Sequence, residues 1–171
     1  MSKEFFLDSG ENIWSEPVNR LSARIRVEFE DLDPGLRHAV YLELKNDSFD
    51  VVTIFNQPQI HAELYDLSGK PVNTWGSTGN GPMPISQWAM IPWNAYIGFR
   101  IDMQGAGVPT KEHGEILLAT GGKNWLLKPG QYVLKIIAEF KNDNDGPSNQ
   151  WTGELKLLPV KVVVTEKMIT R

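Results

Sequence analysis

Hydrophobic and polar residues alternate along much of this chain with a period of two. Over residues 21–30, Leu, Ala, Ile, Val and Phe take the odd positions, while Ser, Arg and Glu take the even positions. This pattern is typical of a strand with one buried and one solvated face. The alternation returns over residues 40–45, 97–103 and 132–141, and shorter apolar runs occupy residues 60–65 and 116–119. We predict a strand at each of these places.

Turn residues separate these strands. Residues 33–35 (Asp-Pro-Gly) predict a turn, since Pro presets φ and Gly accepts positive φ. Residues 66–69 (Asp-Leu-Ser-Gly) predict a hairpin turn with a bulge, followed by a return strand over residues 72–75. Residues 76–95 are rich in Gly, Pro, Met and Trp without a sustained period, and we expect a long irregular insertion there.

The last predicted strand changes phase part-way along. Its apolar residues take odd positions up to Leu157 and even positions from Leu158 onward. A shift of one residue turns every later side chain to the opposite face of a sheet. We therefore predict a β-bulge near Leu158 and Pro159, which returns the later apolar residues to the inward face.

Strands and turns with no convincing helical period predict an all-β chain. Seven or more short strands favour a sandwich or a barrel, and the chain has no repeat, low-complexity tract or linker. Residues 127–132 place Tyr132 at the start of a long strand, directly after a Pro-Gly corner. This resembles the tyrosine corner of immunoglobulin-like folds, in which the phenol bonds to backbone upstream; an ordinary core tyrosine is the alternative.

The predicted architecture is one immunoglobulin-like (fibronectin-III-like) antiparallel β-sandwich over residues 1–171, with an N-terminal extension over residues 1–20. Residues 40–72 contain a strand, a Lys-Asn-Asp-Ser loop, a second strand and a Leu-Tyr-Asp-Leu-Ser-Gly-Lys-Pro-Val turn. This order resembles the bacterial intracellular proteinase inhibitor family, over about residues 21–75 and 125–165. The chain departs from that layout by about 50 inserted residues between Trp75 and Trp125, and no inhibitory loop matches. The resemblance implies the fold, and proteinase inhibition as one alternative function.

Composition removes several classes of function. The 171 residues include 17 basic and 21 acidic residues, so the chain lacks the basic surface that nucleic acid or anionic lipid attracts. No apolar run approaches the roughly 18 residues of a membrane span. The absence of cysteine excludes disulfides, thiolate catalysis and cysteine-based metal sites. The charged N-terminus is no secretory signal as written, which fits the cytoplasm, or the cell envelope if the chain is a trimmed mature form.

Catalytic motifs are missing from the sequence. The three histidines lie in different predicted elements and form no i,i+4 pair. The glycine-rich segments at 105–107 and 121–124 lack the spacing of a dinucleotide or phosphate loop. The chain offers no pair of carboxylates that we can place face to face. We therefore predict that the protein is not an enzyme and needs no organic cofactor.

Two acidic loops form the candidate metal site. Residues 142–146 (Asn-Asp-Asn-Asp-Gly) resemble part of a calcium loop, although Lys141 and Thr152 break the EF-hand pattern. In a sandwich, the loop after the second strand lies at the same end as this segment. The candidate calcium ligands are the acids of these two loops: Asp47, Asp50, Asp143 and Asp145. A solvated polar turn is the alternative, because Asn, Asp and Gly are common in loops.

Tryptophans in or beside the irregular insertion form the candidate binding site. Three of the six tryptophans lie there, and the candidate ligand-binding residues are Trp75, Trp88, Met90 and Trp93. Such rings bury much area at low entropic cost, which suits a protein partner or a sugar. The alternative is a satellite core, and we assign Trp14, Trp125 and Trp151 to the main core.

These observations predict a non-catalytic module that binds a protein partner, or a second copy of itself, through the tryptophan-rich insertion. One alternative is a carbohydrate- or calcium-binding accessory domain of the cell envelope. The other is a proteinase inhibitor.

Overall fold

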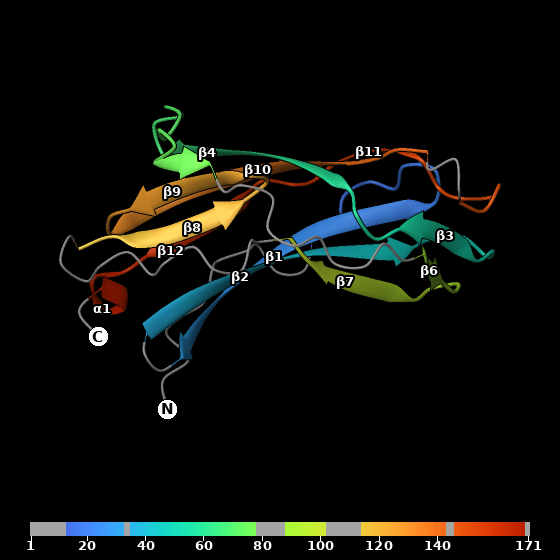
Figure 1. The fold of residues 1–171 in the computed structure, drawn as a ribbon, viewed down its shortest axis with the longest axis horizontal. Helices are drawn as coiled ribbons and strands as arrows, with labels where there is room; N and C mark the ends of the chain where they lie inside the picture. Colours follow the sequence, from blue (N-terminus) through green and yellow to red (C-terminus); the bar gives the residue numbers. More distant parts are fainter. Residues whose placement is uncertain (1–12, 33–34, 78–87, 102–113, 143–145, 170–171) are drawn as a thin grey trace.

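Two layers of antiparallel strands face each other in the computed structural model of the protein (Figure 1). The structure describes residues 13–32, 35–77, 88–101, 114–142 and 146–169. The first layer has three strands in spatial order: β1 (Leu21–Leu32), β2 (Gly35–Asn46) and β7 (Tyr96–Arg100). The second layer has a central strand with neighbours on both sides: β10 (Gly130–Phe140) between β4 (Gln59–Asp66) and the pair β11 (Gly153–Lys156) and β12 (Val160–Val164). The predicted all-β sandwich is confirmed.

The alternating pattern fills the space between the layers. The odd residues of β1 from Leu21 to Val27 are buried, and so are the even residues of β2 from Val40 to Leu44. Strand β10 sends Leu134, Ile136 and Ala138 into the same core. Full burial of one aliphatic side chain of this size stabilises the fold by about 1.5–3 kcal/mol. Burial of these residues therefore determines which side of each strand faces the core.

A tight hairpin forms a separate small sheet beside the second layer. Strands β8 (Ile116–Thr120) and β9 (Lys123–Leu127) are joined by Gly121 and Gly122, whose φ angles are +59° and +73°. Positive φ at both central residues is characteristic of the mirror-image hairpin turn, whose twist matches the twist of the flanking strands. Glycine adopts positive φ without steric cost. Lys123 Nζ donates a hydrogen bond of 2.8 Å to the carbonyl of Ala62, which fixes the hairpin beside β4. A short strand, β5 (Gly76–Ser77), pairs with β9.

The predicted β-bulge is confirmed between β11 and β12. Leu157 N donates to Ile136 O at 3.1 Å, whereas Val160 already lies opposite Leu134. Leu158 and Pro159 are therefore both opposite the single residue Lys135. The extra residue returns the later valines of β12 to the core.

The hydrogen bond expected of a tyrosine corner is also present. Tyr132 Oη donates to the carbonyl of Lys128, four residues upstream, at 2.9 Å. Burial raises the pKa of Tyr132 above its ordinary value, so the phenol keeps the proton that it donates. The contact ties the start of β10 to the preceding turn. Assignment to the immunoglobulin-like class stays a prediction.

Some elements differ from the sequence-based expectation. Strands β3 (Val52–Phe55), β6 (Trp88–Ile91) and β9 were not predicted, and β6 lies at the end of the expected irregular insertion. The expected return strand over residues 72–75 is reduced to a bridge between Tyr65 and Pro71. A one-turn helix, α1 (Glu166–Ile169), closes the described chain. Within the described residues, no helix has the length and apolar character needed to cross a membrane.

Candidate functional site: an exposed aromatic end of the sandwich

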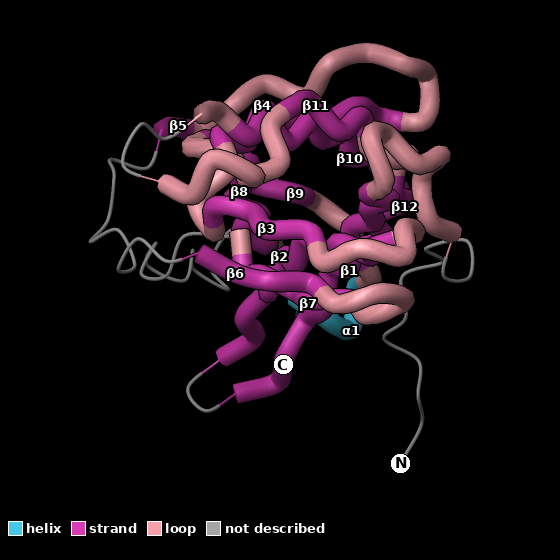
Figure 2. The backbone as a smooth tube through the Cα atoms, turned by 90° about the vertical axis from the view of Figure 1, so that its right-hand side faces the viewer, coloured by secondary structure: helices cyan, strands magenta, loops and turns pink. Residues whose placement is uncertain are grey.

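A bent two-stranded ribbon forms one end of the molecule. Strand β2 leads into β3, and β6 leads into β7; β2 pairs with β7 and β3 pairs with β6, each antiparallel. The ribbon is interrupted where residues 47–51 and residues 92–95 connect its two halves. Figure 1 shows β3 and β6 at the right-hand end of the sandwich, and Figure 2 looks onto that end, with both strands in front of β1 and β2.

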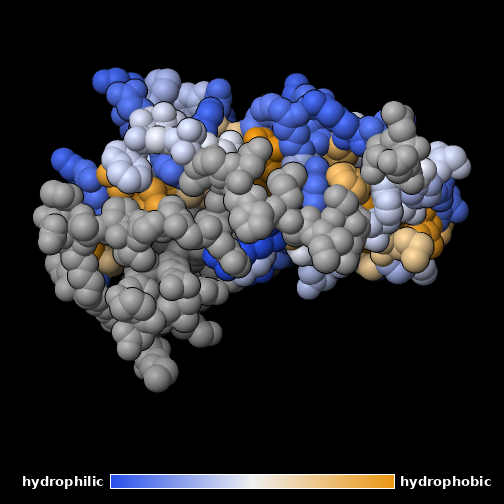
Figure 3. All heavy atoms as spheres, viewed as in Figure 1, coloured by the Kyte–Doolittle hydropathy of each residue, from blue (hydrophilic) through white to orange (hydrophobic). Residues whose placement is uncertain are grey.

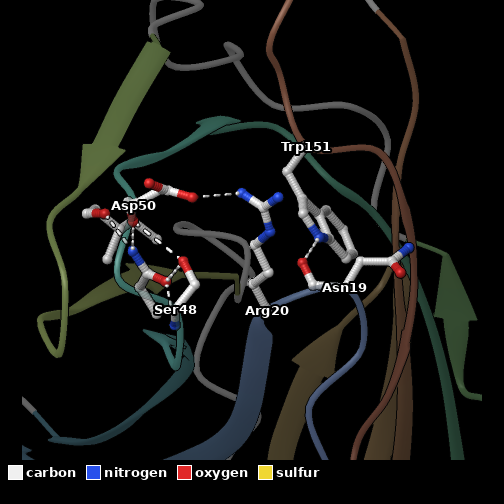
Figure 4. Close-up of polar contacts among 7 residues, drawn as sticks. Asn19, Arg20, Ser48, Asp50 and Trp151 are labelled. Atoms are coloured by element: carbon white, nitrogen blue, oxygen red, sulfur yellow. Dashed lines mark hydrogen bonds and ion pairs between the residues drawn. The ribbon is translucent and has the colours of Figure 1, made fainter.

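Asn46 holds the two connections together. Its side chain is buried, and Asn46 Nδ2 donates to the carbonyls of Asp50 at 2.6 Å and Ile91 at 2.8 Å. Asn46 Oδ1 accepts from the backbone N–H and the hydroxyl of Ser48, at 2.9 Å and 2.8 Å. All four bonds converge on one amide, so the connection between β2 and β3 has a defined shape (Figure 4).

The tight turn before β1 stabilises this connection. Arg20 Nη1 lies 3.3 Å from Asp50 Oδ2, and Trp151 Nε1 donates to the carbonyl of Asn19 at 2.9 Å (Figure 4). Trp151 is itself buried against Phe140, with ring centroids 5.4 Å apart. The turn before β1 therefore links the core to the loop after β2.

Large apolar side chains stand exposed on this framework. We call Phe49, Val51, Met90 and Trp93 the aromatic tip; their exposed fractions are 87%, 52%, 71% and 61%. The rings of Phe49 and Trp93 contact each other across the two connections, with centroids 5.5 Å apart. Figure 3 shows hydrophobic residues gathered at the same end as β3 and β6. Grouped exposure of this kind marks an interaction surface, whereas single exposed apolar residues are ordinary.

The aromatic tip contains two of the four predicted ligand-binding residues. Met90 and Trp93 belong to it, and Trp88 lies on the same strand as Met90 but is half-buried against Phe55, with centroids 5.1 Å apart. Trp75 is 63% exposed but lies beside β5, at the opposite end of the molecule in Figure 1. The structure therefore separates Trp75 from the other three.

The sequence pattern does not predict Phe49 and Val51 as binding residues. They lie in a segment whose other residues, between Asn46 and Asp50, are polar, and this pattern predicts a metal-binding or solvated loop. The available signal was an aromatic residue inside a polar turn, where it has little core to enter.

The four predicted calcium ligands have different outcomes. Asp143 and Asp145 lie outside the described residues. Asp47 accepts from Lys45 Nζ at 2.7 Å and from the Ser22 hydroxyl, and Asp50 pairs with Arg20. Within the described part of the chain, no group of three or more His, Cys, Asp or Glu residues suits a metal ion.

The electrostatics of Asp47 follow from these contacts. Burial by itself raises the pKa of Asp47, but hydrogen bonds from Lys45 and Ser22 outweigh it and hold the pKa below the ordinary aspartate value. Asp47 is thus a charged structural acceptor beside the loop. The aromatic tip itself carries no titratable side chain, so it offers burial of apolar area rather than proton transfer.

No family model matches this chain, and no curated protein matches its sequence. The resemblance to the intracellular proteinase inhibitor family rests on the strand layout alone.

Proposed function

We propose that this protein is a non-catalytic interaction module with an immunoglobulin-like fold, which binds a protein partner through the aromatic tip. The observation that carries the proposal is the exposure of Phe49, Val51, Met90 and Trp93 on strand β6 and on the two hydrogen-bonded connections beside it. Trp is enriched among the few residues that supply most of the binding energy at protein interfaces, and Met is enriched at interfaces generally.

The energetics favour binding over a role in the core. A Trp or Met side chain that is mostly exposed gains little from folding, and its apolar area stays available to an incoming surface. Trp125 is the contrast, since it is only 1% exposed and belongs to the main core. The tip therefore lies on the surface, where a partner can cover it.

The rigid support favours a binding role as well. Asn46 fixes the connection that carries Phe49, and the same amide bonds the carbonyl of Ile91, next to the turn that carries Trp93. A surface that is ordered before binding loses less conformational entropy when a partner arrives. This arrangement suits a preformed site.

Carbohydrate is the second candidate ligand. The exposed ring of Trp93 is the observation that favours it, because an indole face stacks on the apolar face of a sugar. A glycan array distinguishes the two candidates. Binding to a defined glycan that Trp93→Ala abolishes favours the sugar.

The test uses two tryptophans of matched exposure. We expect affinity capture from a lysate of the source organism to recover a stoichiometric protein with the unmodified chain and with Trp75→Ala. We expect Trp93→Ala and Phe49→Ala to lose it. Trp75 is 63% exposed and Trp93 is 61% exposed, so the pair separates position from ring exposure. Equal recovery with all four proteins would rule out the aromatic tip as the binding surface.

A further inference from the structure

Met90 is the sulfur-containing residue of the aromatic tip. It is 71% exposed, whereas Met168, the other methionine among the described residues, is 7% exposed and packs into the main core. Thr165 N also donates to Met168 Sδ at 3.4 Å, so this second thioether has a contact within the chain. A reagent in solvent therefore meets two thioethers in opposite environments.

The strand that carries Met90 is held in place by its neighbours. Met90 lies on the face of β6 that also carries Trp88, since side chains two residues apart share a face. On the other face, Ala89 packs against the core and Ile91 is buried, and the Ile91 carbonyl accepts from Asn46 Nδ2 at 2.8 Å. A chemical change at Met90 therefore alters the surface of the tip and leaves its supporting backbone in place.

Thioethers are the only sulfur groups in this sequence, which contains no cysteine. A peroxide transfers one oxygen atom to a methionine sulfur: the O–O bond breaks, the sulfur loses two electrons, and the second oxygen leaves as water. Methionine sulfoxide reductase reverses the step, because two thiols are oxidised to a disulfide while the sulfoxide oxygen leaves as water. Reversible oxidation of sulfur in this chain is therefore confined to methionine.

We propose that Met90 is a reversible oxidation site, at which a peroxide converts the thioether to a sulfoxide and thereby weakens partner binding through the aromatic tip. The inference rests on the proposed function, since it describes regulation of the same surface. Oxidation turns a flexible apolar side chain into a polar one, and a partner that covers the tip then buries the sulfoxide oxygen against apolar groups. Reduction restores the apolar surface.

The variants that assign the effect use the contrast between the two described methionines. Met90→Leu removes the exposed sulfur and keeps an apolar side chain of similar volume, and Met168→Leu is the matched control that removes the buried sulfur. Three further methionines of the sequence, Met1, Met83 and Met103, lie outside the described residues. Comparison of variants, rather than total oxygen uptake, therefore assigns the effect to one residue.

Peptide mass spectrometry after brief treatment with hydrogen peroxide tests the site itself. We expect Met90 to gain one oxygen atom about tenfold or more faster than Met168 in the folded chain, because a buried sulfur must wait for local opening. We expect the two rates to become equal in guanidinium chloride, where the chain is unfolded. Equal rates in the folded chain would overturn the assignment of Met90 as the preferred site.

Retention on a phenyl column tests the change in the tip without a partner. We expect peroxide to shorten the retention of the unmodified chain and of Met168→Leu, and methionine sulfoxide reductase with dithiothreitol to restore it. Each protein is compared with its own untreated form, and far-UV circular dichroism must show that the treated protein is folded. We expect a smaller shift in Met90→Leu. A shift as large as that of the unmodified chain would overturn the proposal, since another residue would then cause it.

Affinity capture from a lysate, after catalase has removed the peroxide, separates this inference from the proposed function. We expect oxidation to lower partner recovery by the unmodified chain and by Met168→Leu about tenfold, and the reductase to restore it. Undiminished recovery by the oxidised chain would overturn the switch and leave the proposed function standing. If the untreated chain recovers no partner, the proposed function fails and the switch fails with it.

Discussion

Arg20 adopts a left-handed backbone conformation that is unusual for a residue with a Cβ. Its φ is +83°, and that of Asn19 is +45°. The two residues form the turn between Val18 and Leu21, whose backbone groups exchange hydrogen bonds of 2.8 Å and 3.1 Å. Asn tolerates this conformation, whereas Arg bears a cost of roughly 1–2 kcal/mol. The exposed ion pair with Asp50 offsets at most about 1 kcal/mol of it.

We therefore expect Arg20→Gly to leave stability unchanged or raise it by up to about 1 kcal/mol, since relief of the backbone strain outweighs loss of the ion pair. Arg20→Ala is the control, because it loses the ion pair and keeps the strain. We expect it to be less stable than Arg20→Gly by about 1 kcal/mol in urea denaturation. Equal stability of the two variants would mean that the turn is not strained.

Asp47 predicts a specific dependence of stability on pH. Its pKa is below the ordinary value in the folded protein, so its contribution is complete above the unfolded pKa of about 3.9 and is lost as pH falls through the folded pKa. We expect Asp47→Asn to be less stable than the unmodified chain near neutral pH. The difference in free energy of unfolding should shrink below about pH 4. A difference that stays constant into the acid range would contradict this account.

The β8–β9 turn allows conformational cost to be separated from close approach. Gly121 and Gly122 both have positive φ, but a Cβ on Gly121 would lie 3.0 Å from both Ala62 Cβ and the Ile60 carbonyl oxygen, and a Cβ on Gly122 would meet nothing within 4 Å. We expect Gly122→Ala to cost about 1 kcal/mol and Gly121→Ala to cost at least about 1 kcal/mol more. Thermal denaturation measures both. Equal losses of stability in the two variants would mean that Gly121 does not pack closely against β4.

Elements with a long, regular alternation were predictable from the sequence. Strands β1, β2 and β10 each extend over more than ten residues, and their inward faces follow from the period of two. The bulge at Leu158 and Pro159 was predictable for the same reason, since a change of phase leaves few other solutions. The physical basis is that a single buried face determines register.

Short strands were not predictable, because distant partners create them. Strand β3 has four residues and β6 has four, which is too few for a period to be recognised. Each becomes a strand by pairing with the other across about 35 residues of chain, as in the register Phe55 to Trp88. The candidate site was partly predictable for this reason. Met90 and Trp93 were named, whereas their neighbours Phe49 and Val51 come from the other side of the ribbon.

The separation of Trp75 from Trp93 has a similar cause. Both tryptophans border the same segment of the sequence, but Trp75 leads into β5 beside β9, and Trp93 follows β6 beside β3. Pairing with different strands carries them to opposite ends of the molecule. Sequence proximity alone therefore overstated the extent of the tryptophan surface.

At the scale of the whole molecule, the aromatic tip lies at one end of the sandwich, whereas the main core lies between its layers. Substitutions in the tip and in the core are therefore expected to change different properties, namely partner binding for the tip and the free energy of unfolding for the core.

The most direct test of the proposed function compares stability and binding in one variant, Trp93→Ala. Because Trp93 is 61% exposed, we predict that its free energy of unfolding falls by no more than about 1 kcal/mol while partner recovery is lost. Trp125→Ala provides the scale for a core ring, with an expected cost of about 3–5 kcal/mol. A loss of several kcal/mol in Trp93→Ala with undiminished partner recovery would contradict the account, since Trp93 would then belong to the core.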